Sequence, residues 1–401
     1  MISRKIIASI LCTAILITLI AGCAAPAPIA SEEAAPAETQ AANEDVRDEN
    51  IQQEIPAPEQ TDNDAALNQR VDFDAAFATF SPDTVMFTVD EFSVTWAEMF
   101  FLIAGNIRSF MSRFRGLPDL SHAMPDGRTY AETIMDFVVE NSLQFRALER
   151  GATLLDVSLH IGEQDMLELN VQSGILTAGS EENFLDLLWE NSTLYGLELF
   201  RYLIYVEYLP IAIRNKAFGE GGSGLSDEDM QAHFADDGLL MAKHILRRRT
   251  GDEFGYARIK IEELYKQLQN HIGDDFEAFF DKLMFEYSED DVGLSAFPNG
   301  YLFQDGDMEH TFHYAAHALE IGEISEIIET LAGYHIILRL PINFDATPIR
   351  SAMSQHPSSL RLTAANDIFD AMLATWRDSL TPIFTEEFES IDLKEMFREA
   401  D

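Results

Sequence analysis

Apolar residues recur along this chain with two periods, one typical of strands and one typical of helices. Apolar runs at 85–89 and 92–94 flank the acidic pair Asp90-Glu91, which predicts a hairpin-like pair of strands. A helix is expected to begin after Thr95, because Thr95 and Glu98 have the spacing of a capping box. Further helices are predicted at 130–149, 162–173, 181–189 and 194–218. Gly151 lies where the C-terminal cap of the 130–149 helix is expected.

The pattern changes in the block 241–340, which we interpret as the working domain. Its first strand carries His244 in the apolar run 242–246, and its last strand carries His335 in the run 333–338. Between these strands the pattern predicts helices at 256–268 and 275–285, an extended run at 298–303 and a helix from Met308.

The domain boundaries follow from breaks in this pattern. Glycine-rich residues 219–224 interrupt the helical spacing and predict a flexible boundary. We therefore expect a mainly helical region at 81–235, the working domain at 236–343 and a tail at 344–401. The tail contains one amphipathic helix, 364–380, whose apolar face needs a partner surface. We expect it to pack on the helical region before residue 220.

The first residues have the pattern of an export signal. Arg4 and Lys5 precede an apolar run at 6–20, which is too short to span a membrane. The run ends in Ile20-Ala21-Gly22-Cys23, which resembles a bacterial lipobox. It predicts a lipoprotein signal peptide at 1–22 and a lipid on Cys23, so that the chain is anchored outside the cytoplasm to the cell membrane of a bacterium. A plain signal peptide that happens to contain Cys23 is the alternative.

Composition extends this picture. Residues 23–80 are rich in Ala, Pro, Glu and Gln and have no apolar periodicity until Val71, which predicts a disordered tether. The only other cysteine, Cys12, lies in the predicted signal, so no disulfide or thiol chemistry is expected. The formal net charge of −42 makes nucleic acid an unsuitable partner and fits cationic clients or metal-rich surroundings. The alternative is that this charge only secures solubility.

The order of elements in the working domain resembles the parvulin family of peptidyl-prolyl isomerases. The matching motifs are Lys243-His244-Ile245-Leu246, Ser288-Glu289-Asp290, Gly306-Asp307-Met308 and Gly333-Tyr334-His335-Ile336-Ile337. Each motif is short, and the ordered set carries the resemblance over about a quarter of the chain. It implies an α+β fold, with a small four-stranded antiparallel sheet and surrounding helices.

Matched residue by residue, the resemblance implies a site on the central strands. Its catalytic positions are His244, Asp290, Thr330 and His335. Its substrate-binding positions are Met308 and Phe312, which form walls of an apolar pocket for the proline ring, and Phe303 close by. One departure is that Gly300 stands where a pocket leucine is expected. Either Tyr301 or Leu302 supplies that wall, or the pocket is wider and weaker.

The chemistry implied by this resemblance needs neither a cofactor nor a metal. Rotation about an X-Pro bond crosses a barrier of about 18–20 kcal/mol without forming a bond to the enzyme. An apolar socket and groups that favour the twisted amide are sufficient. We therefore expect His244 and His335 to orient and polarise, without proton transfer. The alternative is that both are satisfied core histidines in a fold that has lost its activity.

Two other features of the working domain suggest competing functions. His310, His313 and His317 share a helical face and could bind a transition metal, although no carboxylate or cysteine at a fixed spacing joins them. Arg247-Arg248-Arg249 could attract an acidic or phosphorylated residue before proline. We favour a solvated strand end beside acidic neighbours for the arginines, and no metal site.

The whole chain resembles extracytoplasmic foldases of the PrsA and SurA type, in which a parvulin domain is inserted in a mainly helical chaperone domain. That resemblance implies a prolyl isomerase and chaperone acting on unfolded or newly exported proteins that contain X-Pro bonds, with homodimerisation left open. A holdase with a degenerate parvulin scaffold is the alternative, motivated by Gly300. A solute-binding lipoprotein would need alternating strand and helix units, which the pattern lacks.

Overall fold

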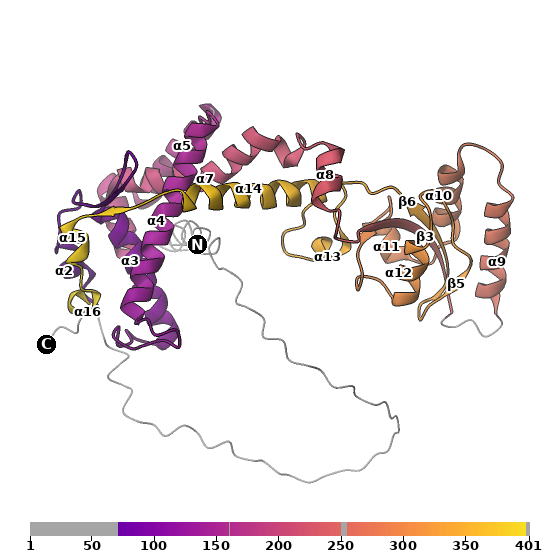
Figure 1. The fold of residues 1–401 in the computed structure, drawn as a ribbon, viewed down its shortest axis with the longest axis horizontal. Helices are drawn as coiled ribbons and strands as arrows, with labels where there is room; N and C mark the ends of the chain where they lie inside the picture. Colours follow the sequence, from indigo (N-terminus) through magenta and orange to yellow (C-terminus); the bar gives the residue numbers. More distant parts are fainter. Residues whose placement is uncertain (1–70, 160, 250–254, 398–401) are drawn as a thin grey trace, which may run out of the picture. The chain divides into compact units, whose positions relative to one another are not determined.

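The computed structural model describes residues 71–159, 161–249 and 255–397. These residues belong to two compact units: unit 1 ends at Pro210 and resumes at Leu373, and unit 2 comprises Ile211–Met372 (Figure 1). The predicted signal peptide at 1–22, Cys23 and the tether up to residue 70 lie outside the described residues. Within the described part of the chain, every helix is too short or too polar to cross a membrane.

Unit 1 is mainly helical and contains one small sheet. Its elements before the division are α2 (Phe73–Phe77), β1 (Val85–Val89), β2 (Phe92–Thr95), α3 (Trp96–Phe114), α4 (Tyr130–Leu154), α5 (Ile161–Ala178), α6 (Glu181–Ser192) and α7 (Gly196–Phe218), which crosses the division at Pro210. Its later elements are β7 (Ile383–Phe384), α15 (Glu386–Glu389) and α16 (Leu393–Met396). Strand β1 pairs antiparallel with both β2 and β7, so the end of the chain completes the sheet begun near residue 85.

The predicted tether ends earlier than residue 80. Helix α2 begins after Asp72, whose side chain accepts a hydrogen bond from the backbone N–H of Ala75 at 2.9 Å. The Phe77 ring packs against Trp96 and Trp189, at centroid distances of 6.5 and 4.8 Å. Residues from Phe73 onward therefore belong to unit 1, because their aromatic side chains are part of its interior.

The expected end of the 130–149 helix is also wrong. Helix α4 begins with the capping box of Thr129 and Glu132 and continues through Gly151 to Leu154. A Cβ atom at Gly151 would lie 2.2 Å from the Trp376 ring. The glycine allows an aromatic ring to approach the helix backbone, so its role is close packing and not a helix cap.

Unit 2 is built around the second sheet. Its elements are η2 (Glu220–Gly222), α8 (Asp227–His233), β3 (Leu240–Arg248), α9 (Tyr256–Gln269), α10 (Phe276–Tyr287), α11 (Asp291–Ala296), β4 (Tyr301–Phe303), α12 (His310–His317), β5 (Ile328–Glu329), β6 (Gly333–Leu340), α13 (Ile349–Ala352) and α14 (Leu360–Asp378), which crosses the division at Met372. The strand order is β4-β3-β6-β5, and every neighbouring pair is antiparallel. The prediction of a four-stranded antiparallel sheet with surrounding helices is confirmed.

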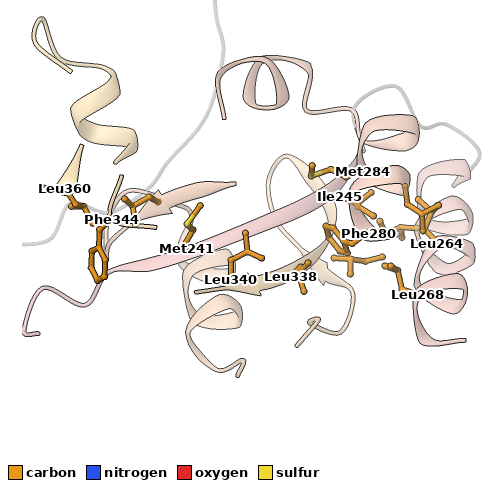
Figure 2. Packing of buried hydrophobic residues seen from close by; sticks show 14 of the residues in the cluster. Met241, Ile245, Leu264, Leu268, Phe280, Met284, Leu338, Leu340, Phe344 and Leu360 are labelled. Atoms are coloured by element: carbon orange, nitrogen blue, oxygen red, sulfur yellow. The ribbon is translucent and has the colours of Figure 1, made fainter. Parts of the chain in front are cut away.

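The sheet of unit 2 has an apolar core on each face. Helices α9 and α10 cover one face, where Ile245 of β3 and Leu338 of β6 meet Leu264, Leu268, Phe280 and Met284 (Figure 2). Helix α12 covers the other face, where Phe312 packs with Phe303 and Ile337. Successive residues of a strand point to opposite faces, so the apolar runs of β3 and β6 supply both cores.

The two units are divided differently from the expected domains. Phe344 and Leu360 are buried at one end of the unit 2 core, near Met241 and Leu340 (Figure 2). Met230, which was expected in the N-terminal region, is fully buried in the same core. The segments on both sides of the parvulin-like block are thus part of unit 2, because its sheet leaves apolar side chains that the block itself does not cover.

Candidate active site

Strand register brings the two predicted histidines together on one face of the sheet. Strands β3 and β6 pair so that His244 is opposite Ile337 and Leu246 is opposite His335. Because side chains alternate between faces, His244 and His335 project on the same side, toward α12. Their rings stack with centroids 5.1 Å apart, and both residues are buried.

A continuous set of hydrogen bonds runs through these histidines. The Nδ1 atoms of His244 and His335 are 2.9 Å apart, and His335 Nε2 is 2.8 Å from Thr330 Oγ1. On the other side, His244 Nε2 is 3.0 Å from Asp290 Oδ2, and the hydroxyl of Tyr301 donates to the same carboxylate oxygen. All four predicted catalytic positions therefore lie in one hydrogen-bonded group, together with Tyr301.

Local sequence explains the position of Asp290. The residue is the N-cap of α11, and its Oδ1 accepts a hydrogen bond from the backbone N–H of Gly293 at 3.3 Å. A Cβ atom at Gly293 would lie 1.5 Å from the Tyr301 hydroxyl. Gly293 therefore leaves the space through which Tyr301 reaches Asp290. The contact between Tyr301 and Asp290 was not predicted, although the Asp-x-x-Gly spacing at the start of a short helix was a visible signal.

The surroundings fix the protonation of the group. The hydrogen bond from His244, helped by those from Tyr301 and Gly293, holds the pKa of Asp290 well below its usual range. Burial and the hydrogen bond to Asp290 raise the pKa of Tyr301 well above its usual range. Burial and the neighbouring His244 lower the pKa of His335 to about 3. At neutral pH Asp290 is thus ionised, Tyr301 is a donor and His335 is neutral.

These protonation states give the hydrogen bonds one direction when both imidazoles are neutral. Ionised Asp290 can only accept, so His244 donates through Nε2 and must accept at Nδ1. His335 then donates through Nδ1 and accepts at Nε2 from the hydroxyl of Thr330. The Thr330 oxygen in turn accepts from the backbone N–H of Ala332 at 3.1 Å.

Every ring nitrogen of the two histidines has a hydrogen-bond partner within this group. Neither ring has a free nitrogen to donate to or accept from a substrate. Asp290 is the most exposed member, with 18% of its side chain accessible against 7% for His244. The group can therefore present a fixed negative charge at its edge, while the histidines hold that charge in place.

The apolar side of the site is formed from α12. The Phe312 ring lies edge-on to both histidines, at centroid distances of 5.3 Å to His244 and 5.6 Å to His335. Met308 is half-buried and packs against the same cluster. Phe303 is fully buried and contacts Phe312 from behind, with centroids 5.8 Å apart. Its position supports Phe312 and does not face solvent.

Leu302 does not belong to this site. It is 1% exposed and packs in the core on the α9–α10 face, whereas its neighbours Tyr301 and Phe303 are on the α12 face. The expectation that Leu302 supplies a pocket wall is wrong, because residues alternate along β4.

Gly300 is a backbone requirement of the turn into β4. It has a φ of +106°, and a Cβ atom there would lie 3.1 Å from the backbone oxygen of Ala242. A side chain at this position would be strained by the positive φ and would crowd β3. The turn therefore accounts for a glycine here.

The arginines at 247–249 and the histidines of α12, which suggested competing functions, contact neighbouring side chains in the fold. Arg247 forms an ion pair with Glu289 at 3.0 Å, and Arg249 forms one with Glu329. Their positive charge is thus already neutralised by neighbouring carboxylates. On α12, the His313 ring stacks with that of His317. Across the described ranges, no cluster of three or more His, Cys, Asp or Glu side chains is placed to hold a metal ion.

Part of the chain is similar in sequence to known proteins. Residues 244–340 match the family model described as "Rotamase: PPIC-type PPIASE domain". The chain is 29% identical to the foldase protein PrsA of Halalkalibacterium halodurans over 217 residues, which cover 52% of this chain and 57% of the relative. It is 38% identical to the foldase protein PrsA of Bacillus subtilis over 116 residues, covering 28% of this chain and 34% of the relative. The chain thus spans about half or less of the length of these curated relatives.

Solved structures of similar proteins include PrsA from Bacillus subtilis, with 19% identity, 71% of this chain and 100% of that chain covered, and a TM-score of 0.24. PrsA from Bacillus anthracis has 22% identity, covers 59% of this chain and 94% of that chain, and gives a TM-score of 0.21.

Proposed function

Residues 244–340 form a parvulin domain of the PPIC type, and from this premise we propose that the chain is a peptidyl-prolyl isomerase and a chaperone of unfolded, newly exported proteins. The observation that carries the proposal is the buried hydrogen-bonded group of Thr330, His335, His244, Asp290 and Tyr301 beside the Phe312 ring. The PrsA foldases to which the chain is similar support the chaperone part.

The proposed mechanism uses binding and charge alone. Phe312 and Met308 provide an apolar surface for the proline ring. Asp290 is placed near the carbonyl oxygen of the preceding residue. A planar amide carries more negative charge on that oxygen than a twisted one, because twisting breaks the resonance. A fixed carboxylate therefore destabilises the planar form more than the transition state, which lowers the barrier.

A protease-coupled assay with a short proline peptide tests this role. Asp290→Asn keeps the shape of the side chain and removes its charge, so kcat/KM should fall by roughly 100-fold. His244→Ala should lower it as well, because Asp290 loses its main hydrogen-bond donor. The matched control is Asp291→Asn, which removes the exposed neighbouring carboxylate and should leave kcat/KM unchanged. Activity unaffected by both Asp290→Asn and His244→Ala would sink the assignment.

The alternative function, a holdase with an inactive parvulin scaffold, was suggested by a pocket wall that is missing at Gly300. The φ of +106° and the close approach to Ala242 account for that glycine without reference to activity.

We propose that the chain acts outside the cytoplasm of a bacterium and is tied to the cell membrane through lipidated Cys23. The basic head, the short apolar run and the Ile20-Ala21-Gly22-Cys23 sequence support this proposal. Expressed in bacteria, the chain should fractionate with membranes, and Cys23→Ser should release it. A homodimer stays a prediction that sedimentation measurements can decide.

A further inference from the structure

Unit 1 contains a cleft of about 470 Å³ that none of the parvulin chemistry uses. It is bordered by β2, the start of α3, α4 and the start of α7, and Glu98, Arg146 and Glu149 are among its lining residues. A volume of this size is within the range of sites that bind small molecules or peptide side chains.

The charges lining this cleft are unbalanced. Arg146 is 3% exposed, and its guanidinium donates to Glu98 at 2.5 Å, to Glu149 at 2.8 Å and to the backbone oxygen of Ser93 at 3.0 Å. One buried cation thus serves two carboxylates. Burial raises the pKa of Glu98 to about 7, and the pKa of Glu149 is raised as well. The cluster thus has one carboxylate more than it has cations, and Glu98 takes up a proton near neutral pH unless a further cation is supplied.

Glu98 is also incompletely hydrogen-bonded. It is 5% exposed, and its Oε1 atom is buried without a hydrogen-bond partner in the described part of the chain. Thr95 and Glu98 form only half of the expected capping box, since Thr95 accepts from the Glu98 backbone N–H while the Glu98 side chain binds Arg146. A buried carboxylate oxygen without a donor is costly, so this one is a place where a ligand donor would be stabilised.

A second cleft, of about 530 Å³, shares Tyr195 and Gly196 with the first. Its lining is largely apolar, with Phe77, Leu185, Trp189 and Leu194. Two carboxylates, Asp74 and Asp186, also line it. Tyr195 is 49% exposed and its ring contacts that of Phe77, so the shared wall is accessible. An apolar cleft and an acidic cleft are therefore neighbours within unit 1, with Tyr195 and Gly196 between them.

We propose that these two clefts together bind an extended polypeptide segment in which a lysine or arginine lies beside an apolar side chain. The cationic group reaches Glu98 and supplies the missing charge and donor, and the apolar side chain contacts Phe77 and Trp189. The carboxylates lining the clefts outnumber their one arginine, which selects against acidic segments. This inference rests on the proposed chaperone function and names the class of client segment.

Isothermal titration calorimetry with proline-free peptides tests the proposal, because such peptides are not substrates of an isomerase. One peptide alternates lysine with leucine and phenylalanine, and its partner carries acetyl-lysine at the same positions. At 0.15 M salt, where general attraction to an acidic protein is largely screened, the lysine peptide should bind about tenfold tighter. Equal Kd values for the two peptides would overturn the proposal.

Glu98→Gln, tested on the whole chain, locates the effect. It removes one negative charge of a strongly acidic protein, and it should abolish most of the preference for lysine over acetyl-lysine. The matched control is Glu140→Gln, an exposed carboxylate on α4, which should keep the full preference. A Glu98→Gln protein with the wild-type Kd for the lysine peptide would refute the assignment of the site.

Two further variants separate loss of peptide binding from loss of folding and from loss of isomerase activity. Tyr195→Ala changes a half-exposed side chain that lines both clefts, and it should weaken binding of both peptides several-fold. This variant tests the site even if Glu98→Gln fails to fold. Unchanged binding would contradict the proposal that one peptide occupies both clefts. His244→Ala should lose prolyl isomerisation and keep peptide binding. Failure of the isomerase proposal and failure of the cleft proposal are therefore seen in different variants.

Discussion

His335 should make the stability of unit 2 depend on pH in a way that one substitution removes. Burial and the neighbouring His244 lower the pKa of His335 from its usual value of 6.5 to about 3 in the folded protein. The unfolded chain therefore binds a proton at a pH where the folded protein does not. The stabilising contribution is present above pH 6.5, falls as the pH drops below 6.5, and is fully lost below about pH 3.

The magnitude follows from this shift. Each pH unit between 6.5 and 5 costs about 1.4 kcal/mol, so unit 2 should lose about 2 kcal/mol between pH 7 and pH 5 through this residue. The residue is 5% exposed, so solvent screening does not reduce the figure appreciably. His335→Gln should remove this part of the pH dependence, whatever its effect on stability at pH 7.

Hydrogen exchange of the β6 amides is the suitable assay. All three tryptophans, Trp96, Trp189 and Trp376, are in unit 1, so tryptophan fluorescence does not report on unit 2. The opening free energy of β6 should fall about 2 kcal/mol more in the wild type than in His335→Gln between pH 7 and pH 5. His356→Gln, which changes an exposed histidine of unit 2, should behave as the wild type. A difference below about 0.5 kcal/mol between the wild type and His335→Gln would refute the argument.

Two other substitutions separate roles within the site. Tyr301→Phe keeps the ring and removes the donor to ionised Asp290, which should destabilise unit 2 by about 1.5–3 kcal/mol. Because Tyr301 positions Asp290, kcat in the peptide assay should fall while KM changes little. A rise in KM alone would instead make Tyr301 a pocket wall. Gly300→Ala combines a positive φ with close contact to Ala242 and should destabilise unit 2 by about 1–3 kcal/mol in hydrogen exchange. Gly322→Ala has a φ of +87° with open space around it and should cost less; equal losses would show that crowding at Gly300 is unimportant.

Much of the candidate site was readable from the chain because its residues lie in short, ordered motifs. His244 and His335 stand in apolar runs long enough for central strands, whereas the short helix that begins after Asp290 was not predicted. One hydrogen bond of the group was not readable. The contact between Tyr301 and Asp290 depends on the space beside Gly293, and that space depends on how α11 meets β4.

The wrong predictions for Leu302 and Gly151 also arose because contacts between distant residues cannot be read from a local pattern. Leu302 was given, as an alternative to Tyr301, for the pocket wall expected at Gly300, but the pleat of β4 directs it to the opposite core. Gly151 was assigned to a helix end because glycine often ends helices, whereas here it makes room for Trp376, more than two hundred residues later in the chain. Composition and local pattern contain no information on such distant neighbours.

Periodicity and capping predicted the kind and order of most elements, because they are local properties of the chain. The polar residues of the site were identified through the resemblance of the working domain to the parvulin family. The tertiary structure decided which side chains meet. Strand register placed both histidines on one face, burial kept His335 neutral, and packing left a carboxylate oxygen of Glu98 without a partner. These outcomes depend on contacts between residues far apart in sequence, whose energies no local pattern records.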